Sequence, residues 1–149
     1  MFKKYFLLLP VFFLYLADQI SKQLVVAVLP EHQAHPVIPG VFYLTRVNNT
    51  GAAFGLFPGA ANILVAVTLI SIWVILFCIL RYHETLRPLQ RWGWILVVGG
   101  ALGNLHDRVL YRYVIDFLDF RVWPVFNLAD SFVCVGVFLV VLGTFRKQR

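Results

Sequence analysis

The chain has 149 residues, of which 60% are hydrophobic and only 13% are charged. A water-soluble domain carries about 25% charged residues, so this composition excludes an ordinary soluble protein and indicates that lipid surrounds part of the chain. The net charge of +6 does not indicate a nucleic-acid partner, because the basic residues are spread over chain ends and loops and form no dense stripe.

Four long apolar segments dominate the sequence. In chain order they cover about residues 5–29, 60–80, 92–110 and 125–145. The second has no charged residue and is long enough to cross about 30 Å of hydrocarbon as a helix. No alternating, barrel-like pattern appears, so helices are the predicted spanning elements. We therefore expect a mostly α, polytopic membrane protein, with a single domain over residues 1–149 and four transmembrane helices.

The distribution of lysine and arginine predicts the orientation in the membrane. These residues concentrate near both chain ends and in segment 81–91, and they are fewer in segments 30–58 and 109–124. Because cytoplasmic loops carry the excess of positive charge, both termini are predicted to be cytoplasmic. Segments 30–58 and 109–124 are then predicted to face outward.

Segment 30–58 differs in composition from the apolar segments. Residues 36–40 predict a turn, residues 41–47 are β-branched and aromatic and predict a strand, and residues 48–51 predict a second turn. We expect a small periplasmic β-sheet platform on the outer surface of the membrane.

Two short patterns inside the apolar segments predict contacts between or within helices. Asp18 and Lys22 are four residues apart, which allows an ion pair on one helix face and makes charge in a membrane less costly. Gly99 and Gly103 have the spacing at which helix backbones approach closely. Both patterns favour a structural role.

Two aspartates, Asp116 and Asp130, have mostly apolar neighbours in the sequence and lie near the predicted membrane edge. A lone carboxylate there is costly and is usually functional, and two that converge would share a proton, as in aspartic peptidases. Two plainer interpretations stay open from the residues alone. Asp130 could cap the last helix, and Asp116 could be a loop residue.

The polar residues near these aspartates in the sequence also allow two interpretations. Asn104, Asp107 and Arg108 lie near one helix face and fit either polar capping at the membrane boundary or the scaffold of a site. No serine or cysteine has a plausible histidine partner, and no zinc motif is present, so neither a metal nor a cofactor is predicted. A small proton- or ion-coupled transporter stays open as the alternative function.

Five short blocks occur in order at residues 18–22, 49–54, 99–108, 114–117 and 126–130. They are DQISK, NTGAAF, GGALGNLHDR, VIDF and FNLAD. Together they resemble the motifs of lipoprotein signal peptidase (signal peptidase II), the bacterial intramembrane aspartic peptidase family. His106 occupies a position that is more often aliphatic in that family, where it would add a titrating group near the site.

The resemblance implies an endopeptidase that removes signal peptides from diacylglyceryl-modified prolipoproteins, cutting on the N-terminal side of the modified cysteine. It implies a location in the bacterial cytoplasmic (inner) membrane and inhibition by globomycin-like cyclic peptides. Asp116 and Asp130 would be the catalytic pair. Residues that would line the site or hold the substrate are Asn49, Gly51, Asn104, Arg108 and Asn127. Structural roles would fall to Asp18, Lys22, Gly103 and Asp107.

Overall fold

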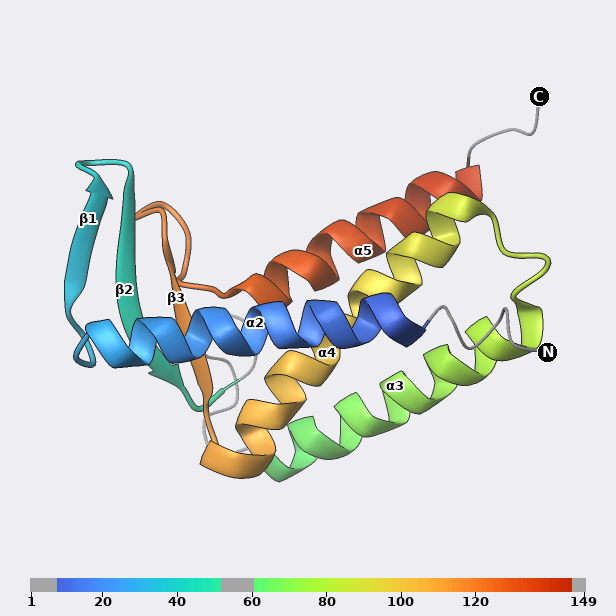
Figure 1. Ribbon diagram of the computed structural model, residues 1–149, viewed down its shortest axis with the longest axis horizontal. Coiled ribbons are helices and arrows are strands. Elements are labelled where there is room, and N and C mark those ends of the chain that lie inside the picture. The colour runs from blue at the N-terminus through green and yellow to red at the C-terminus, as the bar shows by residue number, and fades with distance from the viewer. Residues whose placement is uncertain (1–7, 52–60, 146–149) are drawn as a thin grey trace.

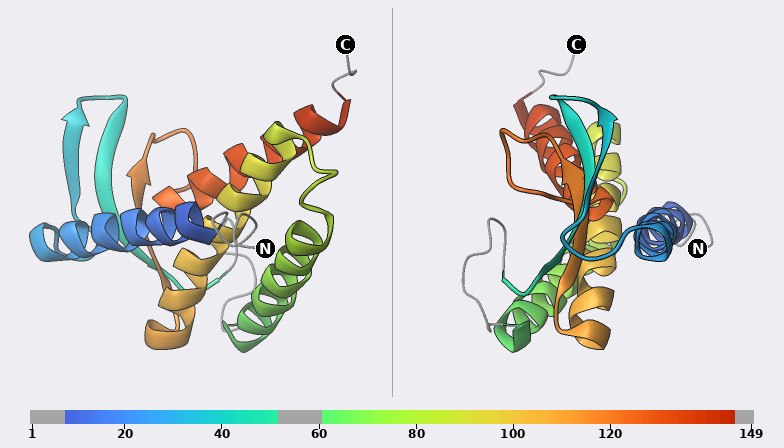
Figure 2. Two further views of the ribbon diagram at one scale, coloured as in Figure 1. Left: turned by 45° about the vertical axis from the view of Figure 1, so that its right-hand side comes forward. Right: turned by 90° about the vertical axis from the view of Figure 1, so that its left-hand side faces the viewer.

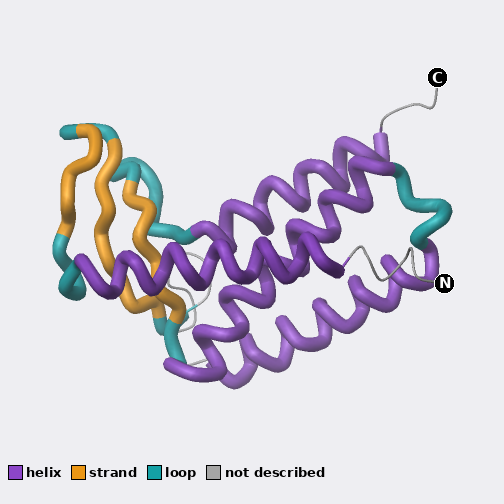
Figure 3. The backbone as a smooth tube through the Cα atoms, viewed as in Figure 1, coloured by secondary structure: helices purple, strands orange, loops and turns teal. Residues whose placement is uncertain are grey.

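The computed structural model describes residues 8–51 and 61–145. Helices form most of this part of the chain, and a small sheet lies at one end of them (Figures 1 and 3). The elements in chain order are α2 (Leu8–Val28), β1 (Ala34–Ile38), β2 (Phe42–Asn49), α3 (Ala61–Tyr82), α4 (Pro88–Tyr111), β3 (Val114–Asp119) and α5 (Leu128–Phe145).

Three of the helices in the described residues are long and apolar enough to cross a membrane: α2, residues Asn62–Tyr82 of α3, and α5. The fourth helix, α4, has 24 residues but is more polar, because it carries the Asn104 to Arg108 block. Three of the predicted segments are therefore helices that are suitable for crossing a membrane, and four transmembrane helices stay a prediction.

Two helices begin at other residues than the sequence predicts, and one predicted start is not tested. The start of the first predicted segment, residues 5–7, lies outside the described residues. Helix α4 begins at Pro88 and not near residue 92, because Arg87 takes the N-cap position and proline suits the first turn. Helix α5 begins at Leu128 and not near residue 125, because Phe126 forms a β-bridge with Leu118.

Helix α4 is the central helix of the bundle and packs against α2, α3 and α5. Its glycines allow this close packing. A Cβ on Gly99 would lie 2.7 Å from Leu14 of α2, and a Cβ on Gly93 would lie 2.6 Å from the carbonyl oxygen of Gly136 in α5. The glycine spacing at residues 99 and 103 therefore marks a helix–helix contact, as predicted.

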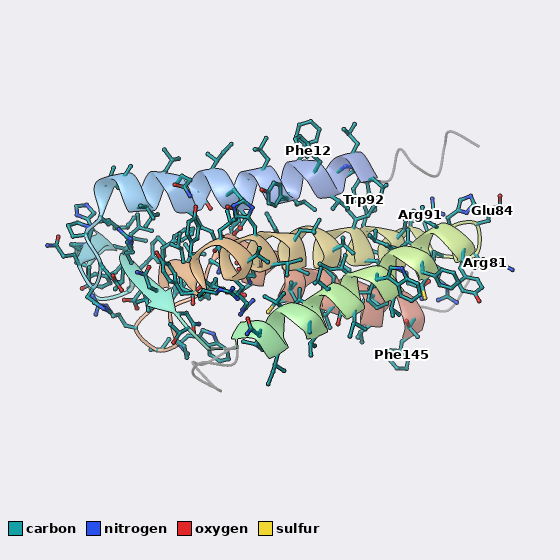
Figure 4. All side chains as sticks on the ribbon, turned by 90° about the horizontal axis from the view of Figure 1, so that it is seen from below. Phe12, Arg81, Glu84, Arg91, Trp92 and Phe145 are labelled. Carbon is teal, nitrogen blue, oxygen red and sulfur yellow. The ribbon has the colours of Figure 1, made fainter. Side chains whose placement is uncertain are left out.

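The outer faces of the helices are apolar, as expected for contact with lipid. Trp73 of α3 is 69% exposed, and the side chains of Phe12 and Phe145 point away from the bundle (Figure 4). The charged side chains of Arg81, Glu84 and Arg91 gather at the end where α3 connects to α4 (Figure 4). That end lies opposite the sheet (Figures 1 and 2).

The sheet has the strand order β1-β2-β3, and both pairs are antiparallel. The predicted turn at residues 36–40 is wrong for residues 36–38, which belong to β1, an edge strand that tolerates a proline. The predicted turn at residues 48–51 is wrong for Asn48 and Asn49, because β2 continues through them and pairs with Ile115 and Val114 of β3. Residues 52–58 of the predicted platform lie outside the described residues.

Candidate active site

The two candidate catalytic aspartates meet beside Asn127. Asp116 lies on β3 and is 3% exposed, and Asp130 lies in the first turn of α5. The Asn127 amide nitrogen Nδ2 donates to Asp116 Oδ1 at 2.6 Å, and the Asn127 backbone N–H donates to Asp130 Oδ2 at 3.2 Å. One asparagine therefore joins both carboxylates.

Asn127 also caps helix α5. Its Oδ1 accepts the backbone N–H of Asp130 at 2.9 Å, and the Asp130 carboxylate accepts the N–H of Asn127 in return. This reciprocal pair is a capping box. The sequence allowed either capping or a role in the site for Asp130. The geometry allows both, because Oδ2 takes part in the cap while Oδ1 accepts a hydrogen bond from Asn104.

Each carboxylate accepts a further amide N–H. Asn104 Nδ2 donates to Asp130 Oδ1 at 2.8 Å, and Asn49 Nδ2 donates to Asp116 Oδ2 at 2.9 Å. The Asn49 amide is fixed in this orientation because its oxygen accepts the N–H of Gly51 at 2.9 Å. Hydrogen bonds of this kind stabilise negative charge on both aspartates.

Both aspartates line a cavity of about 550 Å³ whose walls combine polar side chains with a larger number of apolar ones. Arg108 also lines the cavity and lies within electrostatic range of both carboxylates, and its Nη2 donates to the carbonyl oxygen of Gly51 at 3.3 Å. The apolar part is lined by Val114, Phe120, Trp123, Pro124, Val125, Phe126, Val133 and Cys134. The cavity can therefore hold a polar group against the carboxylates and an apolar group beside it.

Burial and the neighbouring charge change the acidity of Asp116. Desolvation is the larger cause and the negative charge of Asp130 is the second, and together they raise the pKa of Asp116 to about 7. Its hydrogen bonds from Asn49 and Asn127 act in the opposite direction. A carboxyl group with such a pKa can hold or release a proton near neutral pH.

The predicted structural residues lie behind the cavity and do not line it. Lys22 Nζ contacts Asp18 Oδ2 and Asp107 Oδ2, both at 2.8 Å, and all three side chains are 0% exposed. The predicted ion pair of Asp18 and Lys22 is therefore present. A Cβ on Gly103 would overlap the Asp18 carboxylate, so only glycine leaves room for that group.

His106 does not face the cavity. Its ring accepts or donates a hydrogen bond at Nδ1 with the Tyr15 hydroxyl at 2.9 Å, and it lines a separate hollow between α2 and α4. The hydrogen bond and the hollow give no support to a role for His106 at the two aspartates, and such a role stays an untested hypothesis.

Two sets of residues were missed in the sequence. Gln19 donates from Nε2 to Asp107 Oδ1 at 3.0 Å and so belongs to the buried cluster. The apolar lining of the cavity was also missed. A signal was available for part of it, because Val133 and Cys134 follow Asp130 by three and four residues and so share its helix face.

Helices with apolar outer faces and a pair of carboxylates, one on β3 and one in the first turn of α5, are features expected of a membrane enzyme. A solved structure of a bacterial membrane enzyme has the same fold, with a TM-score of 0.85 and 26% sequence identity over 96% of this chain and 93% of that chain. The lipoprotein signal peptidase of Halothermothrix orenii is 42% identical over 135 residues, which are 90% of this chain and 91% of that protein.

A second relative, the lipoprotein signal peptidase of Pelotomaculum thermopropionicum, is 46% identical over 125 residues, which are 84% of this chain and 82% of that protein. The model of the family described as signal peptidase (SPase) II matches residues 10–146. The chain belongs to the signal peptidase II family and is an aspartic peptidase.

Proposed function

We propose that this protein removes signal peptides from diacylglyceryl-modified prolipoproteins, cutting on the N-terminal side of the lipid-modified cysteine. Asp116 and Asp130 are the catalytic pair in this proposal. The observation that carries it is the position of Asn127, which joins the two carboxylates that line a largely apolar cavity. Membership of the signal peptidase II family favours this function over the transporter alternative.

The chemistry divides between the two carboxyl groups. Asp130 is ionised and takes a proton from the attacking water, while Asp116 is protonated and donates to the oxygen of the scissile carbonyl. Water oxygen bonds to the carbonyl carbon and gives a tetrahedral carbon that bears two hydroxyl groups. The carbon–nitrogen bond then breaks, the departing amine takes the proton that Asp130 removed, and one hydroxyl group returns a proton to Asp116 as the product carboxyl group forms. The raised pKa of Asp116 supports its assignment as the acid.

The remaining site residues hold the substrate and the pair. Asn49, Asn104 and Asn127 orient the carboxylates by hydrogen bonds. The positive charge of Arg108 balances the charge of the pair. The apolar part of the cavity takes acyl groups of the lipid-modified cysteine. A substrate without the lipid would lose these contacts and should bind more weakly. A globomycin-like cyclic peptide would occupy the same space.

The location proposed for the protein is the bacterial cytoplasmic (inner) membrane, with α4 as a fourth crossing helix. Both termini would be cytoplasmic, and the sheet and cavity would face outward. The cluster of Arg81 and Arg91 at the end opposite the sheet supports this orientation. Membrane-impermeant labelling of single cysteines placed at Thr85 and at Val41 in whole cells tests it, because only the residue-41 variant should react.

Cleavage of a diacylglyceryl-modified prolipoprotein by the purified protein in detergent tests the function. The wild type, Asp116→Asn and Asp130→Asn are compared with a metal chelator present throughout. Cleavage by the wild type and its loss in both variants would support a metal-independent aspartate pair. Undiminished cleavage in either variant would remove that aspartate from the pair.

A further inference from the structure

The ammonium group of Lys22 has three hydrogen-bond donors and three buried acceptors. Its Nζ lies 2.8 Å from Asp18 Oδ2, 2.8 Å from Asp107 Oδ2 and 3.0 Å from Asn104 Oδ1. An ammonium group has three hydrogens and can only donate, so its donors are all used. The Asn104 oxygen must then face Lys22, and its amide nitrogen must face Asp130.

Each of the three residues that accept from Lys22 also makes a hydrogen bond to Asp130 or to the residue before one of the two catalytic aspartates. Asp18 Oδ1 accepts the backbone N–H of Ala129, the residue before Asp130, at 2.9 Å. Asp107 Oδ2 accepts the backbone N–H of Ile115, the residue before Asp116, at 3.2 Å. Asn104 donates directly to Asp130.

From these contacts we propose that Lys22, Asp18 and Asp107 form a positioning cluster that sets the distance between Asp116 and Asp130. The proposal rests on the function proposed above, in which these two aspartates are catalytic. The three residues are positioning residues and not catalytic residues, because none of them lines the cavity.

Strand β3 and helix α5 belong to different parts of the fold, and the cluster connects both to α2. Residues 120–127 join β3 to α5 and contain no helix or strand apart from a single bridge at Phe126. A β-bridge of Leu118 with Phe126 ties the far end of the strand to the chain that leads into α5. At the other end, Asp107 holds Ile115 and Asp18 holds Ala129, so the backbones next to both carboxylates have one common anchor in Lys22.

Packing alone would not require these charges. A buried ion pair often contributes little net stability compared with apolar residues of similar volume. Its donors and acceptors do fix directions and distances, and a displacement of about 1 Å between reacting groups can lower the rate about 100-fold. The placement of the two N–H contacts next to the catalytic residues is what a positioning role requires.

Matched substitutions at Asp18 separate positioning from charge. Both Asp18→Asn and Asp18→Leu remove the negative charge at similar volume, but only asparagine keeps an oxygen for the Ala129 N–H. We expect Asp18→Asn to lower kcat less than about tenfold and Asp18→Leu to lower it about 100-fold or more, with KM within about threefold in both. Asp107→Asn and Asp107→Leu make the same comparison for the Ile115 N–H.

Two further measurements exclude a purely structural role. Melting temperature and size-exclusion profile in detergent give the folded fraction, so kcat is expressed per folded enzyme. The pH–rate profile is measured for each variant, and the leucine variants should change the separation of its two limbs more than the asparagine variants do. Ser21→Ala is the control on the same turn of α2, because the Ser21 hydroxyl donates only locally, to the Asp18 carbonyl oxygen at 2.7 Å.

Equal kcat values and equal pH–rate profiles for the leucine and asparagine variants, per folded enzyme, would overturn the positioning role. Failure of the proposed function is a different result, since Asp116→Asn or Asp130→Asn would then keep full activity. If both leucine variants fail to fold, the kcat and KM values of the asparagine variants test the positioning role. Positioning expects Asp18→Asn and Asp107→Asn to keep KM and lose little kcat, and a kcat loss of 100-fold or more in either would contradict it.

Discussion

Asp18 and Ala129 are 111 residues apart in the sequence, yet the Asp18 carboxylate accepts the Ala129 backbone N–H at 2.9 Å. This contact passes beside Gly103, where a side chain would overlap the carboxylate. The first helix of the described chain is thereby attached to the first turn of the last one, directly next to Asp130.

Gly103→Ala should disrupt this contact. The added methyl group would displace the Asp18 carboxylate and with it the buried cluster around Lys22. We expect a lower melting temperature and a kcat reduced about tenfold or more. Val109→Ala, on the exposed face of the same helix, is the control and should behave like the wild type. A Gly103→Ala protein with wild-type melting and activity would contradict the close packing.

Asn127 allows capping and catalysis to be tested separately. Asn127→Ser keeps a side-chain oxygen that can cap α5 but removes the amide that donates to Asp116 and Asn104. Asn127→Ala removes both functions. We expect both variants to lose about 100-fold or more in kcat, and only Asn127→Ala to lose the further 1 kcal/mol or so that a cap contributes. Prolipoprotein cleavage and thermal melting in detergent measure the two effects, and a fully active Asn127→Ser would contradict the bridging role.

The pKa of Asp116 predicts how activity depends on pH. Burial and the charge of Asp130 raise this pKa to about 7, and the proposed mechanism requires Asp116 to carry a proton. The value of kcat/KM should therefore fall about tenfold per pH unit above about pH 7. A pH–rate profile that stays flat to pH 9 would contradict the assignment of Asp116 as the acid.

Stability should depend on pH through the same group. The folded-state pKa of Asp116, about 7, lies above its ordinary value of 3.8, so the folded protein holds the proton more tightly than the unfolded chain. The raised pKa of Asp116 adds to the free energy of unfolding. This addition is fully present below pH 3.8 and is lost as the pH rises to about 7. The melting temperature of the wild type relative to Asp116→Asn should therefore fall over this range. If this relative melting temperature rises between pH 3.8 and about pH 7, the pKa of Asp116 is lowered by folding and not raised.

His106→Leu should leave the pH–rate profile unchanged. The His106 ring is paired with Tyr15 and lines a hollow that does not contain the two aspartates. We expect kcat and KM close to the wild-type values between about pH 5 and 8, the range in which histidine titrates. Loss of a limb of the profile in this variant would show that His106 acts on the site through a route that the geometry does not contain.

The sequence predicts local relationships well and distant ones poorly. The ion pair of Asp18 and Lys22 follows from their spacing on one helix, and the helix contact at Gly99 follows from a short motif. The contact of Lys22 with Asn104 spans 82 residues, and no local pattern contains it. The five motifs, taken together, marked Asn49, Asp116 and Asn127 as site residues but not the hydrogen bonds that join them.

The differences between the predicted and the observed elements also have physical causes. Asn48 and Asn49 favour turns locally, and pairing with β3 overrides that preference. Strand β3 was not predicted, because its residues 114–119 are mostly buried and lack the alternation of an exposed strand. The helical assignment of residues 125–127 failed because the bridge between Phe126 and Leu118 depends on a strand that was not foreseen.

The complete burial of Asn127 limits the ways into the site. Its side chain is 0% exposed, and its amide is bonded to Asp116, Asn104 and the Asp130 backbone. In the proposed mechanism, the attacking water would therefore reach the carboxylates from the cavity that both of them line, as the scissile bond does. A ligand that fills this cavity would keep out the substrate and the water together, so tight inhibition would need no direct bond to the protonated carboxyl group.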